Sequence, residues 1–207
     1  MRSRVQLAVA TLDAAHQLMV GNLASVSADD AVQRAGGFRS ILGILKHTAG
    51  WSRVYHSFAF EPKPTHWRGI EWPRGLRDTV DTTQDYFAEI LAWFDSSFTS
   101  WRTSVAGLDD DEFDGPRPCH WGTSAPLFDV LLMVTNHWCY HAGEINQILS
   151  VVRAEAWEYS EEVEENLIST AGHRIRPGWM SDEHAVRYEA YLAMRDTELH
   201  GPTPAPP

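Results

Sequence analysis

Apolar residues recur at spacings of three and four positions along four long stretches of the chain, within residues 5–23, 41–58, 80–105 and 127–152. This spacing places the apolar side chains on one face of an α-helix. No segment alternates convincingly between apolar and polar residues, as a half-buried strand would. The pattern predicts an all-α protein whose four long amphipathic helices pack as an up-down-type four-helix bundle, followed by a C-terminal helical extension.

Glycine and proline mark the segments between the predicted helices. Gly36 and Gly37 precede the second helix, and residues 61–77 contain three prolines, which cannot continue a helix. We expect a long crossover over residues 61–77. Pro126 stands where the first turn of the last helix tolerates proline, and Asp129 complements the N-terminal dipole of that helix.

The regular apolar spacing ends near Arg153. Residues 155–165 are strongly acidic, Ser181 is placed to cap a last helix, and the final residues are rich in proline. We therefore divide the chain into a bundle at residues 1–153, an acidic helical extension at 154–200 and a disordered proline-rich tail at 201–207.

Two histidines lie four residues apart in the last predicted helix. His137 and His141 therefore lie one turn apart on one helix face, where both imidazoles can reach the same ion. His141 also occupies a position in an otherwise apolar seam, and burying a polar ring there costs about 1–3 kcal/mol unless the ring is paired. The spacing alone is weak evidence, because such a pair is about as often structural or solvated.

A functional metal site normally takes a third protein ligand and leaves one coordination position open. His47, in the middle of the second predicted helix, is the leading candidate for this third ligand. His16 is a rival in the seam of the first helix, although an ordinary hydrogen bond also satisfies a seam histidine. His56 and His66 lie nearer to the crossover or inside it.

Three common metal-binding patterns do not fit the His137 segment. A metalloprotease helix needs glutamate directly after the first histidine, and Trp138 stands there. A ferritin-like site needs Glu-x-x-His on each of two helices, whereas His141 precedes Glu144 here. A zinc finger needs a cysteine pair, and Cys119 is the only cysteine before these histidines.

At these residues the sequence resembles the DinB-like (DinB/YfiT) superfamily of metalloenzymes, over roughly residues 1–152. The positions that carry the resemblance are His47 with Trp51 four residues later, and Asn136, His137, His141 and Gly143. The resemblance implies one divalent metal ion, zinc or nickel, held by His47, His137 and His141. Relatives include transferases and isomerases that use mycothiol, bacillithiol or glutathione. A thiol-dependent S-transferase or a hydrolase is therefore one hypothesis, and a non-catalytic metal-binding stress-response protein is the other.

Glu144 is the candidate catalytic residue of this segment. It follows His141 by three positions and His137 by seven, so it shares their helix face. It can act as a general base or can hold an imidazole in place, and a solvated glutamate is the alternative. Cys139 is expected to point away from this face as buried packing. Cys119 and His120 precede the helix and can reach the cavity mouth, although no sequence signal directs them there.

The formal net charge of −11 limits the classes of partner. It repels phosphate backbones, so we expect a small-molecule substrate rather than nucleic acid or an anionic membrane surface. Charged residues interrupt residues 1–20, so we expect neither a signal sequence nor a membrane span there. Two widely spaced cysteines indicate no disulfide framework, which favours the cytoplasm. Pairing of two bundles into a homodimer is left open.

Overall fold

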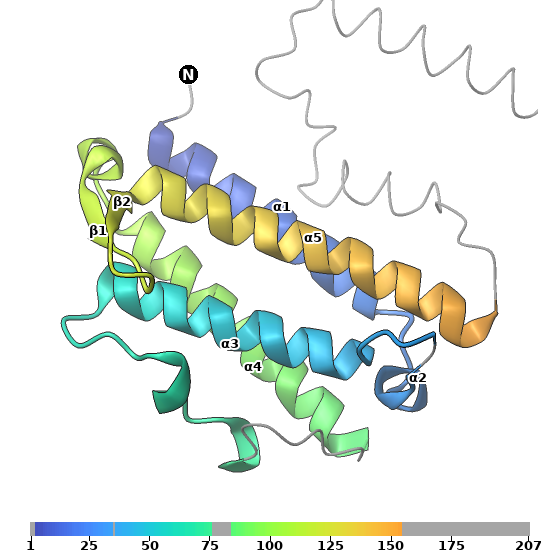
Figure 1. The fold of residues 1–207 in the computed structure, drawn as a ribbon. Helices are drawn as coiled ribbons and strands as arrows, with labels where there is room; N and C mark the ends of the chain where they lie inside the picture. The colour runs from blue at the N-terminus through green and yellow to red at the C-terminus, as the bar shows by residue number, and fades with distance from the viewer. Residues whose placement is uncertain (1–2, 35, 76–83, 155–207) are drawn as a thin grey trace, which may run out of the picture. The chain divides into compact units, whose positions relative to one another are not determined.

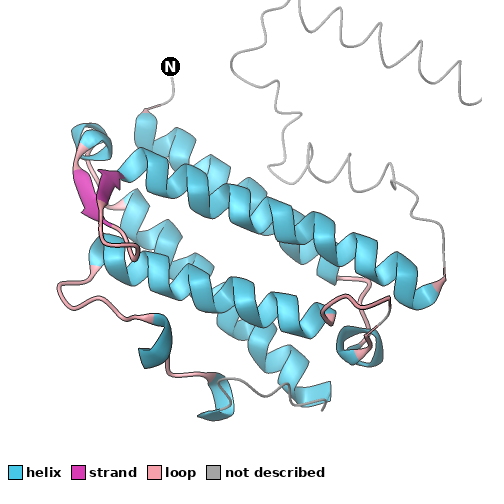
Figure 2. Cartoon of the chain, in the orientation of Figure 1, coloured by secondary structure: helices cyan, strands magenta, loops and turns pink. Residues whose placement is uncertain are grey.

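The computed structural model describes residues 3–34, 36–75 and 84–154. Within these residues the α-helices are α1 (Arg4–Leu23), α2 (Ala28–Val32), α3 (Ile41–Phe60), α4 (Gln84–Ala106) and α5 (Leu127–Arg153). Three short 3-10 helices (Trp67–Gly69, Pro73–Gly75, Asp110–Asp114) and two short strands, β1 (Pro116–Pro118) and β2 (Ser124–Pro126), complete the set (Figure 2). The expected all-α fold with four long helices is confirmed.

Some sequence-based expectations lie outside these residues. The third helix was expected from Val80, but the structure describes it only from Gln84. Residues 155–207 also lie outside the described residues. The acidic helical extension at 154–200 and the tail at 201–207 therefore stay predictions. No helix among the described residues is long and apolar enough to cross a membrane.

The four long helices contact one another in a ring, in the order α1, α5, α3, α4 and back to α1. Helices α1 and α5 run in one direction, and α3 and α4 run in the opposite direction (Figure 1). Helices α3 and α4 are parallel, and residues 61–75, which follow α3, run back along the outside of the bundle (Figure 1). As a result, α3 and α5 lie antiparallel and side by side, and their middle turns face each other.

Serine caps begin three of the helices. The Ser3 and Ser27 side chains accept hydrogen bonds from backbone N–H groups three residues later, and Ser40 does the same for Gly43 at the start of α3. Helix α3 ends at Phe60, and Glu61 is extended, as a residue before proline prefers to be. Pro126 lies at the cap position, one residue before the first helical residue of α5.

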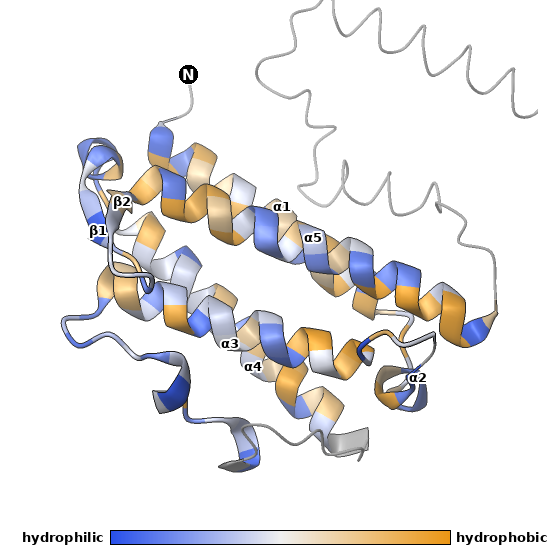
Figure 3. Ribbon diagram, in the orientation of Figure 1, coloured by the Kyte–Doolittle hydropathy of each residue, from blue (hydrophilic) through white to orange (hydrophobic). Residues whose placement is uncertain are grey.

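The core is formed by the apolar seams that the spacing predicts. Its largest fully buried side chains include Trp101, Trp138, Tyr86 and Phe94. Figure 3 shows apolar and polar positions alternating around the long helices. An aromatic side chain that buries roughly 200 Å² contributes about 5 kcal/mol of transfer free energy, so these four residues supply much of the driving force for packing.

Two local elements differ from the sequence-based expectation. The linker before α3 contains the short helix α2, and residues 116–126 form an antiparallel hairpin with Pro116 opposite Pro126. The expectation that the chain contains no strand was therefore wrong for this segment. Prolines in both strands hide the hairpin, because proline normally argues against a strand. The turn is closed by hydrogen bonds from Cys119 N to Thr123 O (2.8 Å) and from Gly122 N to Cys119 O (3.0 Å).

Candidate metal centre

Three histidines converge between α3 and α5. His47 comes from α3, and His137 and His141 come from α5. Each histidine offers one ring nitrogen as a ligand atom, and these three nitrogens lie within 4.8 Å of one another. Such a group can hold a metal ion. The ring centroids are 5.4 Å apart for His47 and His137, 5.0 Å for His47 and His141, and 4.5 Å for His137 and His141.

The geometry of the α5 pair suits a shared ion. The Nε2 atoms of His137 and His141 are 3.1 Å apart. Two nitrogens bound to one tetrahedral zinc ion at about 2.0–2.1 Å lie roughly 3.3 Å from each other, so little movement is needed to accommodate the ion. The spacing of four residues on one helix produces this convergence, as the sequence indicated.

Glu144 fixes the orientation of one of these rings. Its Oε2 atom lies 2.7 Å from Nδ1 of His141, so the imidazole donates Nδ1–H to the carboxylate. With the proton on Nδ1, Nε2 is the His141 nitrogen that can bind an ion, and it faces His137. Of the two roles considered for Glu144, its position in the structure matches the one in which it holds an imidazole in place.

Burial keeps two of the imidazoles uncharged. Burial, followed by the nearby charge of His141, lowers the pKa of His137 to about 3. Burial and the same neighbour lower the pKa of His47 to about 4. Both rings are therefore neutral at pH 7, which is the form that binds a metal ion. Nδ1 of His137 is also buried and has no hydrogen-bond partner among the described residues.

His16 has an ordinary partner on another side of the bundle. Its Nε2 atom lies 2.7 Å from Oδ1 of Asp95, and its ring stacks on Phe98 with centroids 3.8 Å apart. These contacts join α1 to α4. His16 therefore takes the alternative of an ordinary hydrogen bond and does not reach the three-histidine group.

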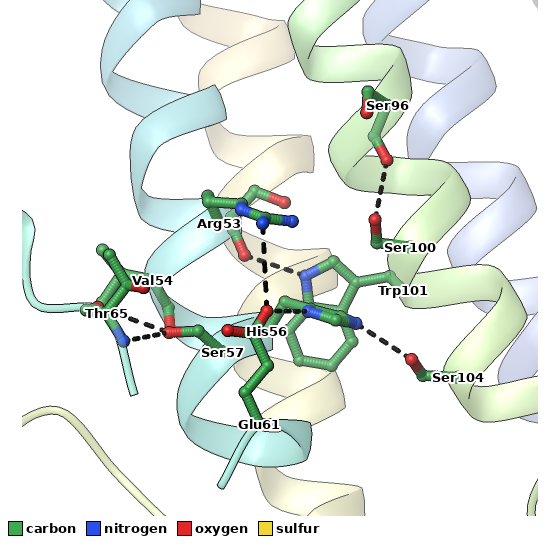
Figure 4. A network of polar contacts seen from close by, with 11 residues as sticks. Arg53, Val54, His56, Ser57, Glu61, Thr65, Ser96, Ser100, Trp101 and Ser104 are labelled. Atoms are coloured by element: carbon green, nitrogen blue, oxygen red, sulfur yellow. Dashed lines mark hydrogen bonds and ion pairs between the residues drawn. The ribbon is translucent and has the colours of Figure 1, made fainter. Parts of the chain in front are cut away.

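His56 is also engaged elsewhere, in the polar network between α3 and α4 shown in Figure 4. Its Nε2 atom lies 2.9 Å from the Ser104 hydroxyl, and its Nδ1 atom lies 3.6 Å from Glu61. Beside it, Trp101 donates its indole N–H to the Ser52 carbonyl at 3.0 Å. His56 thus links α3 to α4 and takes no part in the three-histidine group.

An aromatic cluster packs against the three histidines. Trp51 lies one turn after His47 on α3, and Trp67 comes from the crossover. Their rings stack with centroids 4.7 Å apart, and they lie 6.4 and 6.2 Å from the His47 ring. The close approach of the crossover to α3 depends on Gly50, where an added Cβ would lie 2.9 Å from Trp67 and 2.6 Å from Trp72. The crossover therefore forms part of the surroundings of the site, which sequence reasoning did not detect.

The hairpin turn adds His120 to this cluster. The His120 ring lies 4.7 Å from Trp51 and 5.0 Å from Tyr55, and the Tyr55 ring is 6.0 Å from His137. Burial, with a smaller effect of His66, lowers the pKa of His120. The sequence left the direction of His120 open because nothing local specifies how a hairpin folds back over a helix.

The two cysteines are free and do not join the three-histidine group. Cys119 belongs to the hairpin turn and is buried. Cys139 is exposed on the outer face of α5, so the expectation that it is buried was wrong. The physical reason is that the histidine face of α5 itself points into the bundle, and the opposite face therefore meets solvent. Asn136 is exposed as well.

The comparisons with known proteins agree with this architecture. A family model described as the DinB superfamily matches residues 11–145, which is most of the bundle and includes His47, His137 and His141. Neither the search of curated proteins nor the search of solved structures gives a match. The family match covers well over half of the chain, from the middle of α1 into the second half of α5. The chain therefore belongs to the DinB superfamily.

Proposed function

We propose that the chain is a metal-dependent enzyme that acts on a small molecule, as a thiol-dependent S-transferase or a hydrolase. The observation that carries the proposal is the convergence of His47, His137 and His141 from two helices. The described part of the chain adds no fourth histidine, cysteine or carboxylate to this group. Three protein ligands leave one coordination position of a tetrahedral ion open. A catalytic site needs this open position for water or substrate, whereas a structural site is normally closed by a fourth protein ligand.

The chemistry follows from the donor set. The three histidines would hold one divalent ion, zinc or nickel, and the ion when bound would lower the pKa of a water or thiol ligand towards neutrality. Imidazole ligands do not choose strongly between these metals, so supply and geometry decide which is bound. Superfamily relatives that use mycothiol, bacillithiol or glutathione motivate the thiol.

The residues around the histidines have separate tasks in this proposal. Glu144 holds the His141 ring so that its Nε2 lone pair faces the other ligands. Its side chain is 29% exposed, so the carboxylate can also accept a proton from a group that enters from solvent. Trp51 and Trp67 shield His47 from water, which strengthens electrostatic interactions inside the site.

The net charge of −11 supports a small-molecule substrate over nucleic acid or an anionic membrane surface. A cytoplasmic location and a homodimer stay expectations.

A turnover assay with the metal-loaded full chain tests the enzymatic proposal. The protein is incubated with mycothiol, bacillithiol or glutathione and a panel of alkyl halides, epoxides and activated alkenes, and separately with esters and amides. We expect one class of substrate to be converted, with products identified by mass spectrometry. Because activation depends on the ion, the metal-free protein and His141→Ala are expected to be inactive.

The control for nonspecific chemistry is His16→Ala, since His16 pairs with Asp95 away from the three histidines. It is expected to retain turnover. A fully loaded protein that converts no member of the panel would remove the enzymatic proposal. The non-catalytic metal-binding stress-response protein would then be the better description.

A further inference from the structure

Large apolar side chains lie exposed on the outer surface of α1 and α5. The two helices lie side by side and run in the same direction (Figure 1). Leu7 on α1 is 56% exposed, and Phe128 and Leu132 on α5 are 49% and 48% exposed. Helical periodicity places these three residues on the solvent side of the line along which α1 and α5 meet. The same surface continues towards the C-terminal ends of both helices, and we call it the α1–α5 face (Leu7, Ala14, Gly21, Phe128, Leu132 and Gly143).

The α1–α5 face carries no formal charge. Helix α5 has no Asp, Glu, Lys or Arg between Asp129 and Glu144. After Arg4, the only such residue of α1 is Asp13, which pairs with Arg102 of α4 at 2.9 Å. Two copies of a chain with a net charge of −11 repel each other where acidic surfaces meet. This face lets two copies approach without that repulsion, and it offers no ion pair to a partner that binds through charge.

Two glycines form the other end of the same face. Gly21 and Gly143 lie within α1 and α5, beside the hydrogen bond from Asn22 to the Ala142 carbonyl at 2.8 Å. Neither glycine has a positive φ, and an added Cβ would meet no described atom within 4 Å. A glycine within a helix costs about 0.5–1 kcal/mol relative to alanine, so packing inside the described chain gives no reason for either glycine. Their effect is to keep this end of the surface low.

The bulky end and the low end are complementary to each other. Because α1 and α5 run in the same direction, Leu7, Phe128 and Leu132 lie at one end of the face and both glycines lie nearer to the other. A two-fold axis perpendicular to the face reverses both helices of a second copy. The bulky end of each copy then lies over the glycine end of the other, which is the geometry of an isologous interface.

We propose that the α1–α5 face is the interface of a two-fold symmetric homodimer, in which the bulky apolar end of each copy packs on the glycine end of its partner. The proposal goes beyond the proposed function and does not depend on it. The three histidines lie between α5 and α3, on another side of α5 from α1. Dimerisation through this face therefore leaves the three-histidine group uncovered.

The size of the face suits a stable dimer. Helix α1 has 20 residues and is about 30 Å long, and two packed helices are about 20 Å wide. The face therefore has an outline of about 600 Å² on each copy, or about 1,200 Å² in total, which corresponds to the lower limit of specific protein interfaces.

Sedimentation velocity of the full chain at micromolar concentrations tests the proposal, and we expect the mass of two chains. Leu132→Glu removes an apolar contact and brings like charges together. It is expected to raise the dimer dissociation constant about 100-fold or more, because the substitution occurs twice in an isologous interface. Phe38→Glu is the matched control, since Phe38 is 45% exposed but lies before α3. It should leave the dissociation constant unchanged.

Gly21→Leu tests the opposite end of the face. A side chain at this position points into open space in the isolated chain, so the variant is expected to fold normally by circular dichroism. In the dimer it would occupy the space of a partner side chain, and the dissociation constant should again rise about 100-fold. Ala92→Leu is the matched control, because Ala92 is an exposed small residue on α4.

Cross-linking of Cys139 locates the interface. Cys139 is exposed on α5 between Leu132 and Gly143, whereas Cys119 is buried. A series of bismaleimides of increasing length should join two chains, and Cys139→Ser should prevent this. A monomer at high micromolar concentration would overturn the proposal, and a monomer whose Cys139 resists maleimide would show that another part of the same chain covers the face. A dimer that withstands Leu132→Glu and Gly21→Leu would use a different surface and would also overturn it.

Discussion

Replacing His141 with alanine is expected to reduce the bound metal from about one equivalent per chain to below about one tenth. The variant leaves only His47 and His137, and two imidazoles bind divalent ions weakly. It also removes the ring that Glu144 holds in place. His137→Ala should have the same effect, since its Nε2 atom faces that of His141 at 3.1 Å. Elemental analysis after gel filtration in metal-free buffer measures the loss.

His47→Ala completes the set, and His16→Ala is the control. His16 is a half-buried histidine of the same bundle, but its partner is Asp95, so its loss should leave the metal content unchanged. Circular dichroism checks that each variant is folded. Full metal retention in one of the three ligand variants would remove that histidine from the ligand set.

Glu144→Ala is expected to weaken metal affinity about 10–100-fold without abolishing binding. The carboxylate accepts the Nδ1–H of His141 at 2.7 Å. This hydrogen bond makes Nε2 of the same ring more basic and fixes its orientation, so Nε2 becomes a stronger ligand. The metal affinity of Glu144→Gln should lie between those of Glu144→Ala and the unmodified protein, because the amide oxygen can still accept the hydrogen bond but carries no charge. Competition with a chromophoric chelator measures the affinity of each variant.

Asp129→Asn is the matched control, since Asp129 is an exposed carboxylate in the first turn of the same helix. Its change should leave metal affinity unaltered. If Glu144→Ala bound metal as tightly as the unmodified protein, the hydrogen bond to His141 would have no role in the site. If it bound none, Glu144 would be a ligand rather than a positioning residue.

The bundle was predictable because the long helices repeat one simple signal many times. The apolar spacing over residues 127–152 anticipates α5, which spans Leu127–Arg153, and it places Trp138 and Ile145 in the core. The same regularity predicts that His137 and His141 share a face. His47 followed from family resemblance and its place in the second helix, because no local pattern shows which turns of α3 and α5 will meet.

The surroundings of the site were not predictable for a different reason. Trp67 and His120 reach the site from the crossover and the hairpin turn, and their positions depend on how those segments fold back over α3. Prolines in both strands conceal the hairpin. Cys139 was misplaced because its direction away from the histidines was read as core, whereas the histidine face itself points inward.

X-ray absorption at the zinc edge of the full chain, loaded with one equivalent of zinc, tests the three-histidine centre most directly. The spectrum should show three imidazole nitrogens at about 2.0–2.1 Å, together with one or two further light atoms from solvent and no sulfur at about 2.3 Å. A sulfur shell, a fourth imidazole, or fewer than three imidazoles would contradict an open centre formed by His47, His137 and His141.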